Sequence, residues 1–82
     1  MNILEITSEL EITADISLFF NEAPTTFTTN LISWNNITVN TEKKIIYYNE
    51  SFGKEIFTRQ QYYMILGIAS HYKYTAKERV VS

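Results

Sequence analysis

The sequence predicts an α+β fold, in which an antiparallel meander of three or four strands is covered on one face by a C-terminal helix at about residues 59–73. Three observations lead to this expectation. Apolar residues occupy almost every second position of residues 4–20, which is the period of a strand with one buried face. Two β-branched and aromatic runs flank a short polar loop at residues 40–43, as in a β-hairpin. Apolar side chains then recur at helical spacing through residues 62–72.

The length and the composition set limits on what the chain can be. Its 82 residues form one small domain, 1–82, with no room for a second core. There is no cysteine, so a disulfide framework and a thiolate metal site are excluded, and we expect no cofactor. No run approaches the roughly 20 apolar residues that span a bilayer, and the first residues lack the pattern of a secretory signal. We therefore expect a cytoplasmic protein that does not contact the membrane.

The first strand is predicted at residues 9–20. At 180° per residue its even-numbered apolar side chains fall on one side, whereas at 100° per residue they scatter around a helix. Frequent Ile and Thr also favour a strand. Residues 2–8 remain open between strand and short helix, because Asn2 followed by Glu5 has the spacing of a capping box.

A turn at residues 21–24, around Pro24, separates this segment from a second strand at residues 25–34. We expect Trp34 or Phe27 from the second strand to enter the core.

Residues 37–39 and 44–48 should pair as a hairpin, and residues 54–57 are a candidate short edge strand. Both the Ile45/Tyr47 pair and the Ile46/Tyr48 pair are apolar, so the sequence does not decide which pair faces inward. A strand that is apolar on both sides is usually covered on both faces or lies in an interface. One hypothesis is therefore a homodimer in which this strand pairs with its copy.

The helix at residues 59–73 is the most clearly marked element. Thr58 and Gln61 have the spacing of a capping box. The apolar stripe that should cover the sheet consists of Tyr62, Ile65, Leu66, Ala69 and Tyr72. Thr75 and Glu78 repeat the capping spacing and predict one more helical turn.

Charge is segregated along the chain. Residues 1–40 contain five acidic and no basic residues, and residues 41–82 contain seven basic and four acidic ones. In the predicted strand, Glu9, Glu11 and Asp15 would project from one face, on which alternate residues lie about 6.6 Å apart, a spacing that resembles the phosphates of a nucleic acid. They are candidate partner-binding residues for a basic groove, and the alternative is the solvated face of an ordinary antiparallel sheet.

Two further groups of side chains are candidate binding sites. The first is the rear face of the predicted helix, where small residues between tyrosines leave a notch for a protein partner, unless these residues pack internally or simply stay exposed. Its members are Tyr63, Gly67, Ser70, His71 and Tyr74. The second is the basic C-terminal end, where cations and rings suit nucleic acid, although cations at a helix end also complement its dipole. Its members are Tyr72, Lys73, Lys77 and Arg79.

Nothing in the sequence predicts an enzyme. His71 is the only histidine, and the two glycines cannot form a glycine-rich phosphate loop. Abundant Ile, Asn, Lys, Tyr and Phe indicate a low-GC genome, and small size with segregated charge resembles phage-encoded inhibitors, including anti-CRISPR proteins. The leading hypothesis is a non-enzymatic protein that sterically occludes a host protein or ribonucleoprotein complex. A small nucleic-acid-binding regulator and a homo-oligomeric module are the alternatives.

Overall fold

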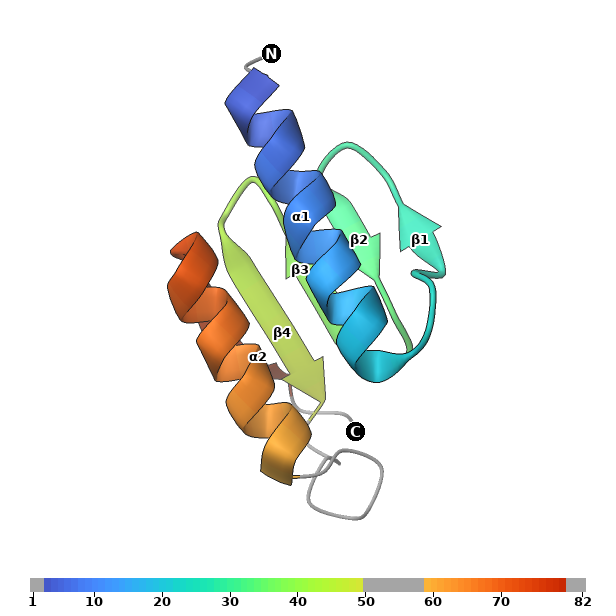
Figure 1. Ribbon diagram of the computed structural model, residues 1–82, viewed down its shortest axis with the longest axis vertical. Coiled ribbons are helices and arrows are strands. Elements are labelled where there is room, and N and C mark those ends of the chain that lie inside the picture. The colour runs from blue at the N-terminus through green and yellow to red at the C-terminus, as the bar shows by residue number, and fades with distance from the viewer. Residues whose placement is uncertain (1–2, 50–58, 80–82) are drawn as a thin grey trace.

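The computed structural model describes residues 3–49 and 59–79. They form α1 (Ile3–Phe20), β1 (Thr26–Phe27), β2 (Leu31–Ser33), β3 (Ile37–Asn40), β4 (Ile45–Asn49), α2 (Arg59–Tyr72) and β5 (Thr75–Arg79). The five strands make one sheet in the order β1-β2-β3-β4-β5, and both helices lie on the same face of it (Figure 1). The α+β class, the meander and the helical lid are therefore confirmed.

The prediction of a strand at residues 9–20 was wrong, because α1 runs through this segment. A strand of that length would exceed the usual five or six residues, and the run contains no glycine or proline to interrupt a helix. The polar Thr13 fits the helix because its hydroxyl donates a 2.7 Å hydrogen bond to the Glu9 carbonyl one turn earlier. Ile12 and Ile16, one turn apart, are both fully buried.

The predicted second strand at residues 25–34 divides into two. β1 and β2 pair antiparallel, with Thr26 opposite Ser33 and Phe27 opposite Ile32, and the chain turns between them. Thr28 closes this turn, since both its amide and its hydroxyl donate to the Leu31 carbonyl. The sheet therefore gains a strand that the sequence pattern did not separate.

The hairpin and the C-terminal helix are confirmed. β3 and β4 pair antiparallel from Ile37 opposite Tyr48 to Asn40 opposite Ile45. α2 spans Arg59–Tyr72, as the helical spacing indicated. The proposed capping residues Asn2 and Thr58, and the candidate edge strand at 54–57, lie outside the described residues.

The predicted helical turn after Thr75 was wrong, because the chain forms β5 there, parallel to β4. α2 ends at Tyr72, and Lys73 takes a left-handed φ of 63°. The Tyr74 amide then donates to the Ala69 carbonyl and the Lys73 amide to the Ser70 carbonyl, which together form a Schellman motif. This motif turns the chain back along the edge of the sheet.

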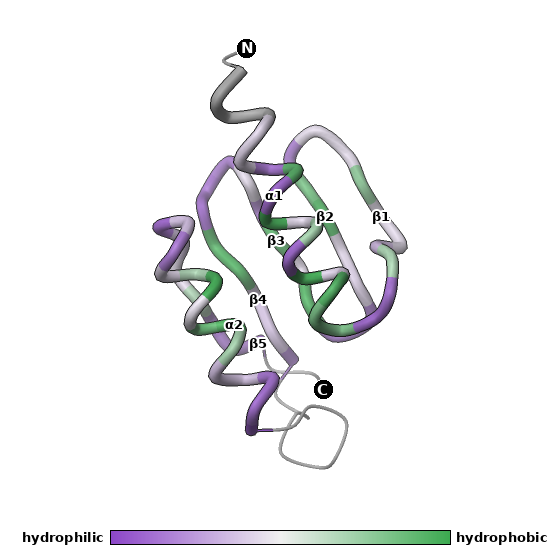
Figure 2. Tube along the Cα trace, viewed as in Figure 1, coloured by the Kyte–Doolittle hydropathy of each residue, from purple (hydrophilic) through white to green (hydrophobic). Residues whose placement is uncertain are grey.

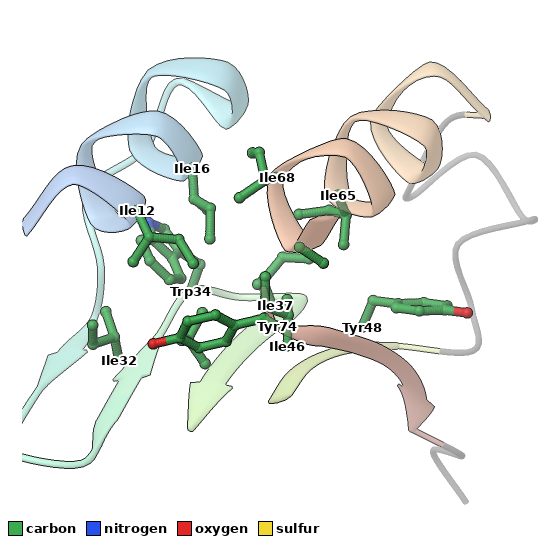
Figure 3. Packing of buried hydrophobic residues seen from close by; sticks show 12 residues of the cluster. Ile12, Ile16, Ile32, Trp34, Ile37, Ile46, Tyr48, Ile65, Ile68 and Tyr74 are labelled. Carbon is green, nitrogen blue, oxygen red and sulfur yellow. The ribbon is translucent and has the colours of Figure 1, made fainter. Parts of the chain in front are cut away.

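The core lies between the helices and the sheet, where Ile16 and Ile68 face one another above the strands (Figure 3). Trp34 is buried as expected, and its indole nitrogen donates to the Ser17 hydroxyl of α1, whereas Phe27 is half exposed. In β4 Ile46 and Tyr48 face inward, which answers the question, left open by the sequence, of which apolar pair of this strand is buried. The other buried core residues are Ile12, Ile32, Ile37, Val39, Ile65, Ala69 and Tyr74.

Candidate functional site

The acidic residues of the N-terminal segment do not form one row. Because the segment is a helix, Glu9 lies about 200° around the axis from Glu11 and is half buried. Glu11 and Asp15 are one turn apart and exposed, so they share a flank of α1. The predicted row of carboxylates on one strand face is therefore absent, and a pair of acids on one helix flank takes its place.

This acidic flank is joined to the end of α2. The Tyr72 hydroxyl donates a 2.5 Å hydrogen bond to Asp15 Oδ2. Burial, then the hydrogen bond to Asp15, then the charges of Asp15 and Glu11 raise the pKa of Tyr72 to about 12. Tyr72 therefore links the two helices and is not free to serve in the nucleic-acid site for which the sequence suggested it.

Four of the five residues predicted on the rear of the C-terminal helix are exposed on α2. They are Tyr63, Gly67, Ser70 and His71. A Cβ atom placed at Gly67 would meet nothing within 4 Å, so the surface beside this glycine is open.

The assignment of Tyr74 to this face was wrong. It follows the end of α2 and is only 8% exposed. Figure 3 shows its ring among the core residues, while the Lys44 ammonium lies 5.2 Å from the ring centroid. Burial first, and then the charge of Glu9, raise the pKa of Tyr74. Tyr74 is therefore a core residue with a polar tip.

A groove between the helices is the strongest candidate site. It has a volume of about 400 Å³ and is lined by Asp15, Leu18, Phe19, Met64 and Ile68. We call these five residues the interhelical groove. Leu18 is 83% exposed and Met64 is 39% exposed, so water covers the apolar rim of the groove. An apolar hollow of this kind between exposed aliphatic side chains is typical of a protein-docking surface.

Leu18 lies between the interhelical groove and a second depression. On its other side a more open depression of about 490 Å³ is lined by Ser17, Asn21, Glu22 and Ala23, together with Leu18 itself. The side chain therefore projects as a knob from the last turns of α1. A partner that covered it would bury nearly the whole leucine side chain.

Sequence reasoning missed this surface. Leu10, Ala14 and Leu18 repeat at intervals of four, which places them along the exposed side of α1. Hydrophobic and hydrophilic residues alternate along the part of α1 that Figure 2 colours. Helical winding therefore puts apolar residues on both the buried and the exposed side of α1. The spacing of four would have revealed the stripe if the segment had been read as a helix.

The proposed nucleic-acid residues separate in the structure. Lys73 follows α2, whereas Lys77 and Arg79 lie on β5 and alternate toward the face of the sheet away from the helices. Arg79 Cζ lies 4.8 Å from the centroid of the Tyr47 ring.

Within the described ranges, no group of three His, Cys, Asp or Glu side chains is placed to hold a metal ion. None of the described helices is long and apolar enough to cross a membrane. Comparison of the chain with protein-family models, curated proteins and solved structures found no match.

Proposed function

We propose that the protein is a non-enzymatic binding protein that occupies a surface of a larger macromolecule through its helical layer. The observation that carries this proposal is the exposure of Leu18, 83%, at the rim of an apolar groove. Full burial of a leucine side chain contributes about 1.5–3 kcal/mol, so leaving Leu18 exposed without a partner forgoes most of that stabilisation. Leu18 would insert into the partner while the interhelical groove accepts an apolar side chain from it.

Charge favours a basic partner surface. Glu11 and Asp15 flank the groove on α1, and Asp15 lines it. Carboxylates at the rim of an interface mainly accelerate association with a positively charged partner. A protein or ribonucleoprotein that handles nucleic acid offers such a surface. With the low-GC composition, this extends the proposal to a phage-encoded or mobile-element inhibitor of host machinery, of the anti-CRISPR type.

The strand-pairing homodimer is a weaker proposal. β4 lies between β3 and β5 in the sheet, so neither edge of β4 is free to pair with a copy. Self-association would have to use another surface, and the interhelical groove is one apolar surface among the described residues. A second copy is therefore one possible partner for that groove.

The test uses the chain as bait in lysate of a low-GC bacterium, with chemical crosslinking to identify the retained protein. Leu18→Ala and Met64→Ala should each reduce its retention at least tenfold. Leu31→Ala is the matched control, because Leu31 is 39% exposed, as Met64 is, but lies in the sheet. Equal retention by all three variants, or no specific retention by the wild-type chain, would contradict the proposal.

Light scattering at high concentration separates the homodimer from a foreign partner. A dimer that dissociates on Leu18→Ala substitution assigns the groove to a second copy. A wild-type monomer leaves the groove to a foreign protein.

A further inference from the structure

The face of the sheet opposite the helices is uncovered by any described element. Ile46 and Tyr48 of β4 are buried under the helices, so the alternating Ile45, Tyr47 and Asn49 project from the other face. We call this face, opposite the helices, the outer sheet face. On this face Ile45, Tyr47 and Asn49 are only half buried, which fits a strand whose outer side is in contact with solvent.

The strand register gathers cations beside Tyr47. β5 is parallel to β4, and Tyr47 lies opposite Lys77 while Asn49 lies opposite Arg79. The guanidinium carbon of Arg79 is 4.8 Å from the Tyr47 ring centroid, within cation–π distance. Lys77 and Arg79 are both exposed. An aromatic ring and two cations therefore occupy neighbouring positions on one surface.

The outer sheet face carries no acidic residue among those described. Glu78, between the two cations, has the opposite parity and lies opposite Tyr48, on the side of the helices. The acids Glu9, Glu11 and Asp15 belong to α1. The acids of α1 and the two cations of β5 therefore lie on opposite sides of the sheet.

We propose that the outer sheet face binds single-stranded nucleic acid. Lys77 and Arg79, alternate residues about 6.6 Å apart on one strand, contact successive phosphates. A base stacks on Tyr47 or on the guanidinium plane of Arg79. The uncovered face of the sheet is accessible to unpaired bases, whereas the faces of bases in a duplex are stacked and hidden. Two cations give weak binding, with a Kd in the non-specific range of about 10⁻⁴–10⁻⁶ M.

The test is fluorescence anisotropy of a labelled 12-nucleotide oligothymidylate titrated with the full chain. Two phosphate contacts predict an affinity that falls about 25-fold between 20 and 200 mM salt. Lys77→Gln and Arg79→Gln should each lower the salt slope by about 0.7. Tyr47→Ala should weaken binding about tenfold at either salt concentration, because it removes a stacking surface.

Arg59→Gln is the matched control, since it removes an exposed arginine from the first turn of α2 on the helical side of the protein. It should bind as the wild-type chain does, and circular dichroism should show all variants folded. Equal weakening by Arg59→Gln and Arg79→Gln would overturn the proposal, as would the absence of binding at 20 mM salt. Equal displacement of the oligonucleotide by polyglutamate would also overturn it and assign the face to acidic proteins.

Discussion

The Tyr72 hydroxyl and Asp15 Oδ2 lie 2.5 Å apart and connect residues separated by 57 positions in the chain. The bond ties the last turn of α2 to the flank of α1, and Asp15 also lines the interhelical groove. One carboxylate therefore both accepts a hydrogen bond from the end of α2 and lines the candidate site. Groups with two such roles are suitable first targets for mutation.

Tyr72→Phe should lower the free energy of unfolding by about 0.5–1.5 kcal/mol at pH 7, because it removes one hydrogen bond to a charged acceptor at the surface. The folded state raises the pKa of Tyr72 from 10.0 to about 12, so it holds the phenolic proton more tightly than the unfolded chain does. This contribution is complete below pH 10 and is lost as the pH rises from 10 to 12.

Urea denaturation between pH 9 and pH 12 measures this effect. The wild-type chain should lose stability across that window more steeply than Tyr72→Phe. Both chains also lose stability there through Tyr48 and Tyr74, whose pKa values are also raised in the folded state. Asp15→Asn should flatten the dependence as well, and the two effects should not add in the double variant. Additive effects would show that the hydrogen bond does not couple the helices.

Lys73→Gly should stabilise the protein by about 0.5–1 kcal/mol. Lys73 has a left-handed φ of 63° in the Schellman motif that ends α2, a conformation that costs a non-glycine residue and is free for glycine. Asn21 ends α1 with a φ of 54°, and Asn tolerates this region, so Asn21→Gly should gain less. Chemical denaturation measures both. A larger gain at Asn21 would argue against strain as the cause.

Gly67→Ala should raise the midpoint of thermal unfolding by about 4–8 °C. Its φ is not positive and an added Cβ meets nothing within 4 Å, so the substitution gains the roughly 1 kcal/mol by which alanine favours a helix interior. The matched control Ala14→Gly, at an exposed site of α1, should lower the midpoint by a similar amount. If the open surface at Gly67 contacts a partner, Gly67→Ala weakens binding despite the added stability, and unchanged binding would remove Gly67 from the site.

Residues 37–49 and 59–72 could largely be predicted from the sequence because their local periods agree with their packing. Ile37 and Val39 alternate with polar residues and are both buried, and Ile65 and Ala69 recur at helical spacing and are both buried. The exposure of Tyr63 followed from the same helical wheel. Tyr74 was misplaced because a left-handed residue ends the helix before it, and no strong signal such as glycine marks that position.

The segment at residues 9–20 could not be predicted from periodicity because its apolar residues alternate without lying on a strand. The rule that apolar residues are buried fails for half of them: helical winding places Ile12 and Ile16 inside and leaves Leu10, Ala14 and Leu18 outside. The wrong strand prediction and the missed apolar surface thus have one cause. Local disagreement between pattern and packing is common at functional surfaces, where stability gives way to binding.

Ile16 and Leu18 provide the decisive comparison between the two readings of that segment. On a strand, both side chains would face the core, and both alanine substitutions would strongly lower the stability of the fold. On the helix, Ile16 is fully buried and Leu18 is 83% exposed. Ile16→Ala should therefore cost about 2–5 kcal/mol, and Ile16→Val, the milder variant, about 0.5–1.5 kcal/mol. Leu18→Ala should stay within about 0.5 kcal/mol of the wild-type value in urea denaturation.

The same comparison validates the binding test. Because Leu18→Ala is expected to leave the fold intact, a loss of partner binding by this variant reports the contact itself and not unfolding. If Leu18→Ala lowered the free energy of unfolding as much as Ile16→Ala does, the Leu18 side chain would be buried in solution. In that case the interhelical groove is already occupied by the chain itself, and the docking proposal fails together with its explanation for the exposed leucine.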